Sequence, residues 1–332
     1  MDQRNIGSLT VPVVGLGCNQ FGTATCDEAT SRQVVAEALD GGITYFDVAD
    51  EYGQNYADRS VVGGFGRSEE ILGRALQGRR DSVVIATKFG SHPNGEEAAP
   101  NGRGGNSARW VRVAVEDSLR RLGSDYIDLY QVHFPDPSVP ITETLGALDD
   151  IVQTGKVREI GCCNFTDAML DEAAGVASGG GLRPFVSVQN SLNLFQRGAL
   201  DSVVPACERL GMSFIPYYPL ASGMLTGKYR RGMALPSDTR LTDGFMVTAE
   251  ARARLFSDRT FARLEALEEF ASARGHSLLE LAIGWLLAQP TVATVIAGAA
   301  HPGQAAANAA AAGWRLSAEE AEEATQAVLA AA

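Results

Sequence analysis

The sequence predicts an α/β protein, a (β/α)8 TIM barrel with an N-terminal β-hairpin and long loops on the C-terminal face. Short β-rich runs alternate with amphipathic helical runs from end to end, and strands that alternate with helices form a parallel sheet. The number of strand–helix units and the length of 332 residues favour a closed barrel over an open doubly wound sheet. No composition break or Ser/Pro-rich linker divides the chain, so residues 1–332 are expected to form a single domain.

Eight strands are expected, each rich in β-branched or aromatic residues. The start of the first strand is expected to form the hairpin with the residues before it. The eight segments are 11–19, 44–48, 81–89, 126–134, 156–165, 184–193, 212–220 and 291–299.

Helical segments with capping and stop signals follow the strands. Asp27 is a typical N-cap and Gly41 a typical stop, another helix opens with Ser68 and acidic residues, and Gly123 and Gly155 end two more. The expected helices are 27–41, 68–78, 107–123, 141–155, 166–177, 199–211, 258–274, 277–288, 302–311 and 317–330. The long segments that follow strands, and so are expected on the C-terminal face, are 53–67, 90–107 and 221–257.

Composition excludes several classes of protein. The net charge of −12 argues against a nucleic-acid partner and against binding to an anionic membrane surface. The chain has no apolar run of about 18 residues and no signal-peptide pattern at its N-terminus. An odd count of five cysteines without a secretory signal indicates free thiols in a cytoplasmic protein. The four histidines show no paired spacing and no HExxH motif, so no metal site is expected.

Polar side chains stand where the predicted strands end, which is where a barrel of this kind carries its chemistry. Lys88 can lie beside Asp47 of the preceding strand, which would allow that carboxylate to be buried. The ammonium is expected to lower the pKa of Tyr52 and to make it a general acid for a carbonyl oxygen, which His133 would orient. Each residue taken alone is more typical of a surface or core position, but together they indicate an active site. Further strand-end residues are Asn164, Gln189 and Tyr217.

Five motifs, "YFDVADEYG", "VVIATK", "DYIDLYQVH", "GKVREIGCCNF" and "YYPLASGMLTGKY", resemble the aldo-keto reductase superfamily from about residue 8 to residue 315. The resemblance implies a (β/α)8 barrel that transfers hydride between a nicotinamide cofactor and a carbonyl or alcohol without metal or flavin. The family's catalytic tetrad corresponds to Asp47, Tyr52, Lys88 and His133.

The same resemblance implies the cofactor contacts. Asn164 and Gln189 would bind the nicotinamide carboxamide, Tyr217 would stack on its ring, and Cys163 stands where the family usually has Ser. Pro219, Leu220, Gly223, Leu225 and Lys228 correspond to the segment that covers the pyrophosphate. The remaining expected contacts are Gly17 and Cys18 after the first strand, and Gly298, Gln304 and Asn308 at the adenosine.

The adenosine segment departs from the family pattern. Members that hold the 2′-phosphate of NADPH commonly carry Arg or Lys here, whereas this chain has Ala299 and Ala300, with His301 as the one basic candidate. The family favours NADP(H) as the cofactor, and NAD(H) is the alternative.

The expected function is therefore reduction of an aldehyde or ketone, a small-molecule substrate, with NAD(P)H. Two alternatives use the same site: an NAD(P)+-dependent aldose or alcohol dehydrogenase, and a cofactor-sensing binding subunit with little turnover. A Rossmann enzyme is disfavoured, because Gly15-x-Gly17 is followed by Gln20 where the fingerprint requires glycine.

Overall fold

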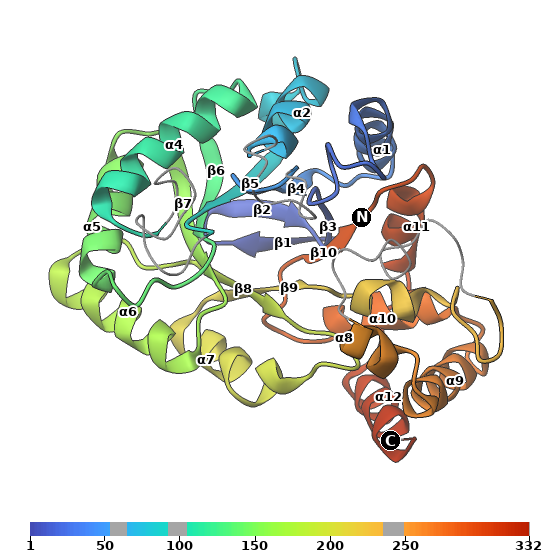
Figure 1. Ribbon diagram of the computed structural model, residues 1–332. Coiled ribbons are helices and arrows are strands. Elements are labelled where there is room, and N and C mark those ends of the chain that lie inside the picture. Colours follow the sequence, from blue (N-terminus) through green and yellow to red (C-terminus); the bar gives the residue numbers. More distant parts are fainter. Residues whose placement is uncertain (54–64, 92–104, 235–248, 332) are drawn as a thin grey trace.

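The strands form a parallel barrel in the computed structural model, which describes residues 1–53, 65–91, 105–234 and 249–331 (Figure 1). The strand order is β10-β3-β4-β5-β6-β7-β8-β9. A parallel bridge between Phe214 and Val292 joins β9 to the residues before β10, so the predicted barrel is confirmed. The bounds are β3 (Val14–Gly17), β4 (Tyr45–Asp47), β5 (Val84–Phe89), β6 (Ile127–Val132), β7 (Val157–Cys163), β8 (Ser187–Ser191), β9 (Ser213–Tyr217) and β10 (Val295–Gly298).

An antiparallel hairpin of β1 (Gln3–Ile6) and β2 (Leu9–Pro12) precedes the barrel, as predicted. Its apolar residues pack with Tyr45 and Leu129 in a separate small core. The expectation of one strand over 11–19 is wrong, because the chain changes partners at Val13. The amide of Val13 donates to the carbonyl of Asp2, just before β1, and the Val13 carbonyl accepts from the amide of Val295 in the barrel.

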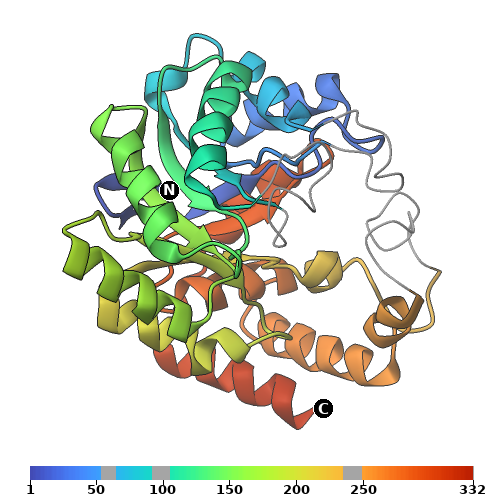
Figure 2. The same ribbon diagram turned by 60° about the vertical axis from the view of Figure 1, so that its left-hand side comes forward.

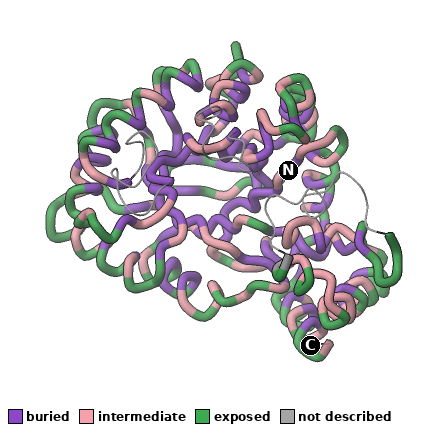
Figure 3. The backbone as a smooth tube through the Cα atoms, in the orientation of Figure 1, coloured by how far each residue is buried: buried purple, intermediate pink, exposed green. Residues whose placement is uncertain are grey.

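Helices surround the barrel and bury the faces that point inward (Figures 2 and 3). They are α1 (Glu28–Asp40), α2 (Arg67–Ala75), α4 (Ala108–Leu122), α5 (Ile141–Gln153), α6 (Asp167–Gly180), α7 (Val203–Leu210), α8 (Ala249–Leu255), α9 (Asp258–Ser272), α10 (Leu278–Leu287), α11 (Gln304–Ala311) and α12 (Ala318–Ala330). Short 3-10 turns are η1 (Arg80–Ser82), η3 (Gly198–Asp201) and η4 (Ala221–Thr226). No helix of these described ranges is long and apolar enough to cross a membrane.

The helix signals in the sequence were correct at several ends and wrong at one. The side chain of Asp27 accepts from the Thr30 amide at the start of α1, and Gly123 ends α4 with the left-handed φ of 60°. Ser68, however, does not cap α2, which begins at Arg67. Its hydroxyl is buried and donates to the Cys18 carbonyl at 2.7 Å, because tertiary packing supplies it with a partner inside the barrel wall.

Two further segments differ from expectation. The helix expected over 199–211 is divided into η3 and α7, and part of the segment 221–257 forms η4 and α8. Residues 54–64, 92–104 and 235–248, which hold much of the three long predicted loops, lie outside the described residues.

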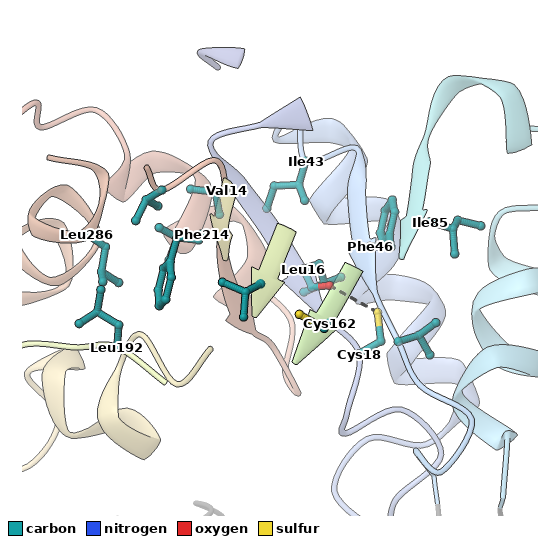
Figure 4. Packing of buried hydrophobic residues seen from close by; sticks show 14 of the residues in the cluster. Val14, Leu16, Cys18, Ile43, Phe46, Ile85, Cys162, Leu192, Phe214 and Leu286 are labelled. Atoms are coloured by element: carbon teal, nitrogen blue, oxygen red, sulfur yellow. Dashed lines mark hydrogen bonds between the residues drawn. The ribbon is translucent and has the colours of Figure 1, made fainter. Parts of the chain in front are cut away.

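The core lies between the barrel strands and the surrounding helices. Figure 4 shows Val14, Leu16, Phe46 and Phe214 of the strands packed with residues such as Leu286 of α10. All five cysteines are free thiols, as predicted, and all five are buried. This rigid wall holds the strand ends, and therefore the polar side chains that follow them, in fixed positions.

Candidate active site

A buried ion pair connects the ends of β4 and β5. Lys88 Nζ lies 2.5 Å from Asp47 Oδ1 and donates to the Val48 carbonyl at 3.1 Å. Both side chains are almost completely buried. A buried charge requires a partner, so the predicted pairing explains why a carboxylate can lie inside the barrel.

Tyr52 extends this pair into the chain of three residues that the sequence predicts. Lys88 Nζ donates to Tyr52 Oη at 3.3 Å. The expected lowering of the tyrosine pKa is not found. Burial, followed by the carboxylates of Asp47 and Glu51, raises the pKa of Tyr52 well above 10. Tyr52 therefore keeps its proton at neutral pH and is a hydrogen-bond donor in the resting site.

His133 follows β6 and lies edge-on to the Tyr52 ring, with 5.7 Å between ring centroids. Burial, and then the ammonium of Lys88, lowers the pKa of His133 well below 6.5, so the imidazole is neutral at pH 7. The structure thus brings all four predicted catalytic side chains together at the ends of three adjacent strands.

The side chains predicted to bind nicotinamide surround the same group. Gln189 Nε2 donates to Asp47 Oδ2 at 2.8 Å, Asn164 Nδ2 donates to the His133 carbonyl at 2.8 Å, and Tyr217 Oη donates to Asn164 Oδ1 at 2.8 Å. Each amide can make four hydrogen bonds, so both retain capacity for a carboxamide. These residues therefore fit a nicotinamide group.

The other predicted cofactor contacts occupy varied positions. Gly223 has a φ of 91°, and a Cβ there would come within 3.0 Å of Lys228 Nζ, so this segment has backbone close to a positive charge. Cys18 is fully buried, with its thiol directed at the Leu16 carbonyl (Figure 4), and Cys163 is buried beside Gln131. The remaining positions are Gly17 beside Gly298 at the ends of neighbouring strands, Pro219, Leu220 and Leu225 around η4, and Gln304 and Asn308 on α11.

Two amides of the site were missed in the sequence. Gln131 Nε2 lies 3.4 Å from Asp47 Oδ2, and Asn190 Oδ1 accepts from the amide of Asn164, which has the left-handed φ of 62°. Strand alternation could have identified Gln131, because it precedes His133 by two residues and so shares its side of the strand. Asn190 had no comparable signal.

A second buried charged cluster lies next to the tetrad. Glu69 accepts from Arg121 Nε at 2.6 Å and from Thr87 Oγ1 at 2.6 Å. Asp50 is completely buried, and neither of its carboxyl oxygens has a hydrogen-bond partner within the described part of the chain. Burial, then the charges of Glu69 and Glu51, raises the pKa of Asp50 well above 3.8. Burial and the neighbouring carboxylates therefore favour the protonated form of Asp50.

Asp50→Asn should remove a pH dependence of stability. The raised folded-state pKa stabilises the protein fully below the unfolded pKa of about 4, and this contribution is lost as pH rises towards the folded pKa. The native chain should therefore lose stability from pH 5 to pH 9.5, whereas Asp50→Asn should not. The difference in unfolding free energy, variant minus native chain, should grow by about 1–3 kcal/mol over this range. Urea unfolding at both pH values measures it, with exposed Glu172→Gln as the control. Parallel pH profiles for the native chain and Asp50→Asn would contradict the raised pKa of Asp50.

A parallel barrel whose strand ends hold a carboxylate, an ammonium, a phenol and an imidazole is the arrangement that the sequence resemblance leads one to expect of an oxidoreductase. The chain belongs to the aldo/keto reductase family, whose model matches residues 13–328. Enzymes of this family use nicotinamide cofactors.

Known proteins agree with this assignment. The chain is 36% identical over 313 residues to aldo-keto reductase YhdN of Bacillus subtilis, covering 92% of this chain and 87% of that protein. It is 30% identical to L-glyceraldehyde 3-phosphate reductase of Escherichia coli, covering 89% and 82%. The structure of the glycerol dehydrogenase AKR11B4 from Gluconobacter oxydans matches with a TM-score of 0.81 and 31% identity, covering 99% and 95%.

Proposed function

We propose that this chain reduces an aldehyde or ketone with NAD(P)H, with Tyr52 as the general acid. The observation that supports it best is the buried chain of contacts from Asp47 through Lys88 to the Tyr52 hydroxyl, with neutral His133 beside it. A protonated phenol next to a fixed ammonium is suited to protonating an oxygen that becomes negative during reaction.

A nicotinamide cofactor, when bound, supplies the hydride. Tyr52 donates its proton to the substrate oxygen, and the ammonium of Lys88 stabilises the phenolate that remains. The raised pKa of Tyr52 is compatible with this step, because an alkoxide is a much stronger base than a phenolate. Asp47 gives the buried ammonium of Lys88 an ion-pair partner, and the neutral imidazole of His133 lies beside the phenol, where it can contact the substrate oxygen.

Oxidation of an alcohol with NAD(P)+ is the second candidate, since the same residues can run the reaction in reverse. The matched structure is described as a glycerol dehydrogenase, which favours this direction, whereas the Escherichia coli relative is described as a reductase. A cofactor-sensing subunit would bind the cofactor without appreciable turnover. Steady-state assays with an aldehyde and with its alcohol therefore separate the three functions.

The cofactor preference depends on α11 and the residues before it. The family favours NADP(H). One contact favours NAD(H): the Gly303 amide, just before α11, donates to the Glu37 carboxylate at 2.6 Å. In the same segment, Gln304 Oε1 accepts from the Ala300 amide at 2.9 Å. A carboxylate at this helix terminus would repel a 2′-phosphate.

Ala300→Arg should strengthen NADPH binding about tenfold or more and leave NADH binding unchanged, because a guanidinium can pair with the 2′-phosphate. Fluorescence titration with each cofactor measures both dissociation constants, with Ala330→Arg, on the exposed side of α12, as the control. Unchanged NADPH affinity would show that residues 298–308 are not the adenosine segment. If the folded native chain bound neither cofactor, the proposed function would be wrong.

A further inference from the structure

Glu51, the residue before Tyr52, places a carboxylate beside the imidazole of His133. Glu51 Oε1 lies 3.6 Å from His133 Nδ1, slightly beyond hydrogen-bond distance. The histidine side chain is 8% exposed and that of Glu51 is 20% exposed. His133 Nδ1 is itself buried, and in the described part of the chain it has no hydrogen-bond partner. Glu51 is thus the acidic group in position to act on this nitrogen.

The surroundings of the ring hold it in this orientation. His133 stacks on Phe134, with centroids 4.8 Å apart and 18° between the planes, and meets the Tyr52 ring at 80°. Burial, and then the ammonium of Lys88, lowers the pKa of His133 well below 6.5, so the neutral imidazole carries a single ring proton. That proton can lie on Nδ1 or on Nε2, and the nearby charge decides which.

A carboxylate near Nδ1 favours the proton on that nitrogen. The attraction between the carboxylate and the ring proton falls when the proton moves to Nε2 on the far side of the ring. At a partly buried site, this energy difference corresponds to a preference for the Nδ1 tautomer on the order of tenfold. With the proton on Nδ1, Nε2 carries the lone pair and accepts a hydrogen bond.

We propose that Glu51 is a positioning residue that holds the His133 proton on Nδ1, so that Nε2 accepts a hydrogen bond from a substrate hydroxyl. The identity of this ligand rests on the proposed function. Tyr52 donates and His133 accepts, so the resting site matches an oxygen that both accepts and donates. An alcohol has such an oxygen, whereas a carbonyl oxygen only accepts. The site therefore binds alcohols more tightly than the corresponding carbonyl compounds.

The consequence must appear in binding. An enzyme does not change the equilibrium constant of its reaction. Glu51 therefore cannot raise kcat/KM for one direction of the reaction without raising it for the other. It can change the inhibition constant of the alcohol relative to the KM of the carbonyl compound. A residue that merely stabilised the fold would change the inhibition constant of the alcohol and the KM of the carbonyl compound to the same extent.

The first test is the position of the ring proton, which requires no turnover. Nitrogen NMR of protein labelled in its four histidines distinguishes protonated from unprotonated ring nitrogens, and a His133→Asn variant assigns the signals. The native chain and Glu51→Asp, which keeps the negative charge of the carboxylate, should carry the proton on Nδ1. Glu51→Leu should lose this preference, and Glu172→Gln should match the native chain. A native proton on Nε2, or a Glu51→Leu spectrum identical to the native one, would overturn the proposal.

The second test uses 4-nitrobenzaldehyde and 4-nitrobenzyl alcohol as a matched pair of probes. Glu51→Leu should weaken inhibition by the alcohol about tenfold relative to the KM of the aldehyde, and Glu51→Asp, which keeps the charge, should retain most of the native difference. Equal changes in both constants would reject the role of Glu51 in binding the hydroxyl. Absence of turnover in the native chain would instead contradict the proposed function, and the NMR result would still stand on its own.

Discussion

Tyr52→Phe should lower kcat for carbonyl reduction by about 10²–10⁴-fold, the contribution typical of a general acid. The variant removes the phenolic hydroxyl that Lys88 contacts at 3.3 Å and leaves the Asp47–Lys88 pair intact. The affinity for the cofactor should stay within about twofold of the native value, because the amides of Asn164 and Gln189 are unchanged.

The measurement compares kcat with the dissociation constant of the cofactor in the same preparation. Tyr126→Phe is a matched control. Tyr126 lies just before the start of β6, at the opposite end of the barrel, and its hydroxyl donates to the carboxylate of Asp81. This control should retain native turnover. Near-native kcat in Tyr52→Phe would remove this tyrosine from the role of proton donor.

Lys88→Met should lower kcat by about 10²–10³-fold and also destabilise the fold. The substitution leaves Asp47 buried, and among the residues that the structure describes its remaining side-chain partners are the amides of Gln189 and Gln131. Breaking a buried ion pair by removing one partner costs about 3–5 kcal/mol. The variant should therefore lose both activity and unfolding free energy.

The double variant Asp47→Asn with Lys88→Met separates these two losses. Removing both charges should restore much of the stability, because a buried pair replaced as a whole is close to neutral. Activity should stay low, because the phenolate of Tyr52 would still lack its ammonium. Recovery of turnover together with stability would show that Lys88 acts only through the fold.

The strand ends that form the candidate site were predictable, because in a barrel all parallel strands end at the same face. Parallel strands end at one face, so Asp47, Lys88 and His133 had to lie near one another once the strands were recognised. The proximity of Lys88 to Asp47 followed from charge alone, since each needs the other when buried.

Properties that depend on the exact surroundings were not predictable. The pKa of Tyr52 was expected to fall because of the ammonium, but burial and two carboxylates outweigh this effect. Arg121 reaches Glu69 across 52 residues of sequence, and Gln189 reaches Asp47 across 142. Periodicity within one segment carries no information about such partners.

The sequence by itself determined the alternation of strands and helices, most helix ends and the four candidate catalytic side chains, because these depend on local pattern and on the order of motifs. Tertiary structure alone decided that Val13 leaves the hairpin for the barrel, that Ser68 is buried, and that Glu51 faces His133. Those features arise from contacts between segments far apart in the chain, where packing and burial, rather than local preference, set which groups meet and which of them keep a proton.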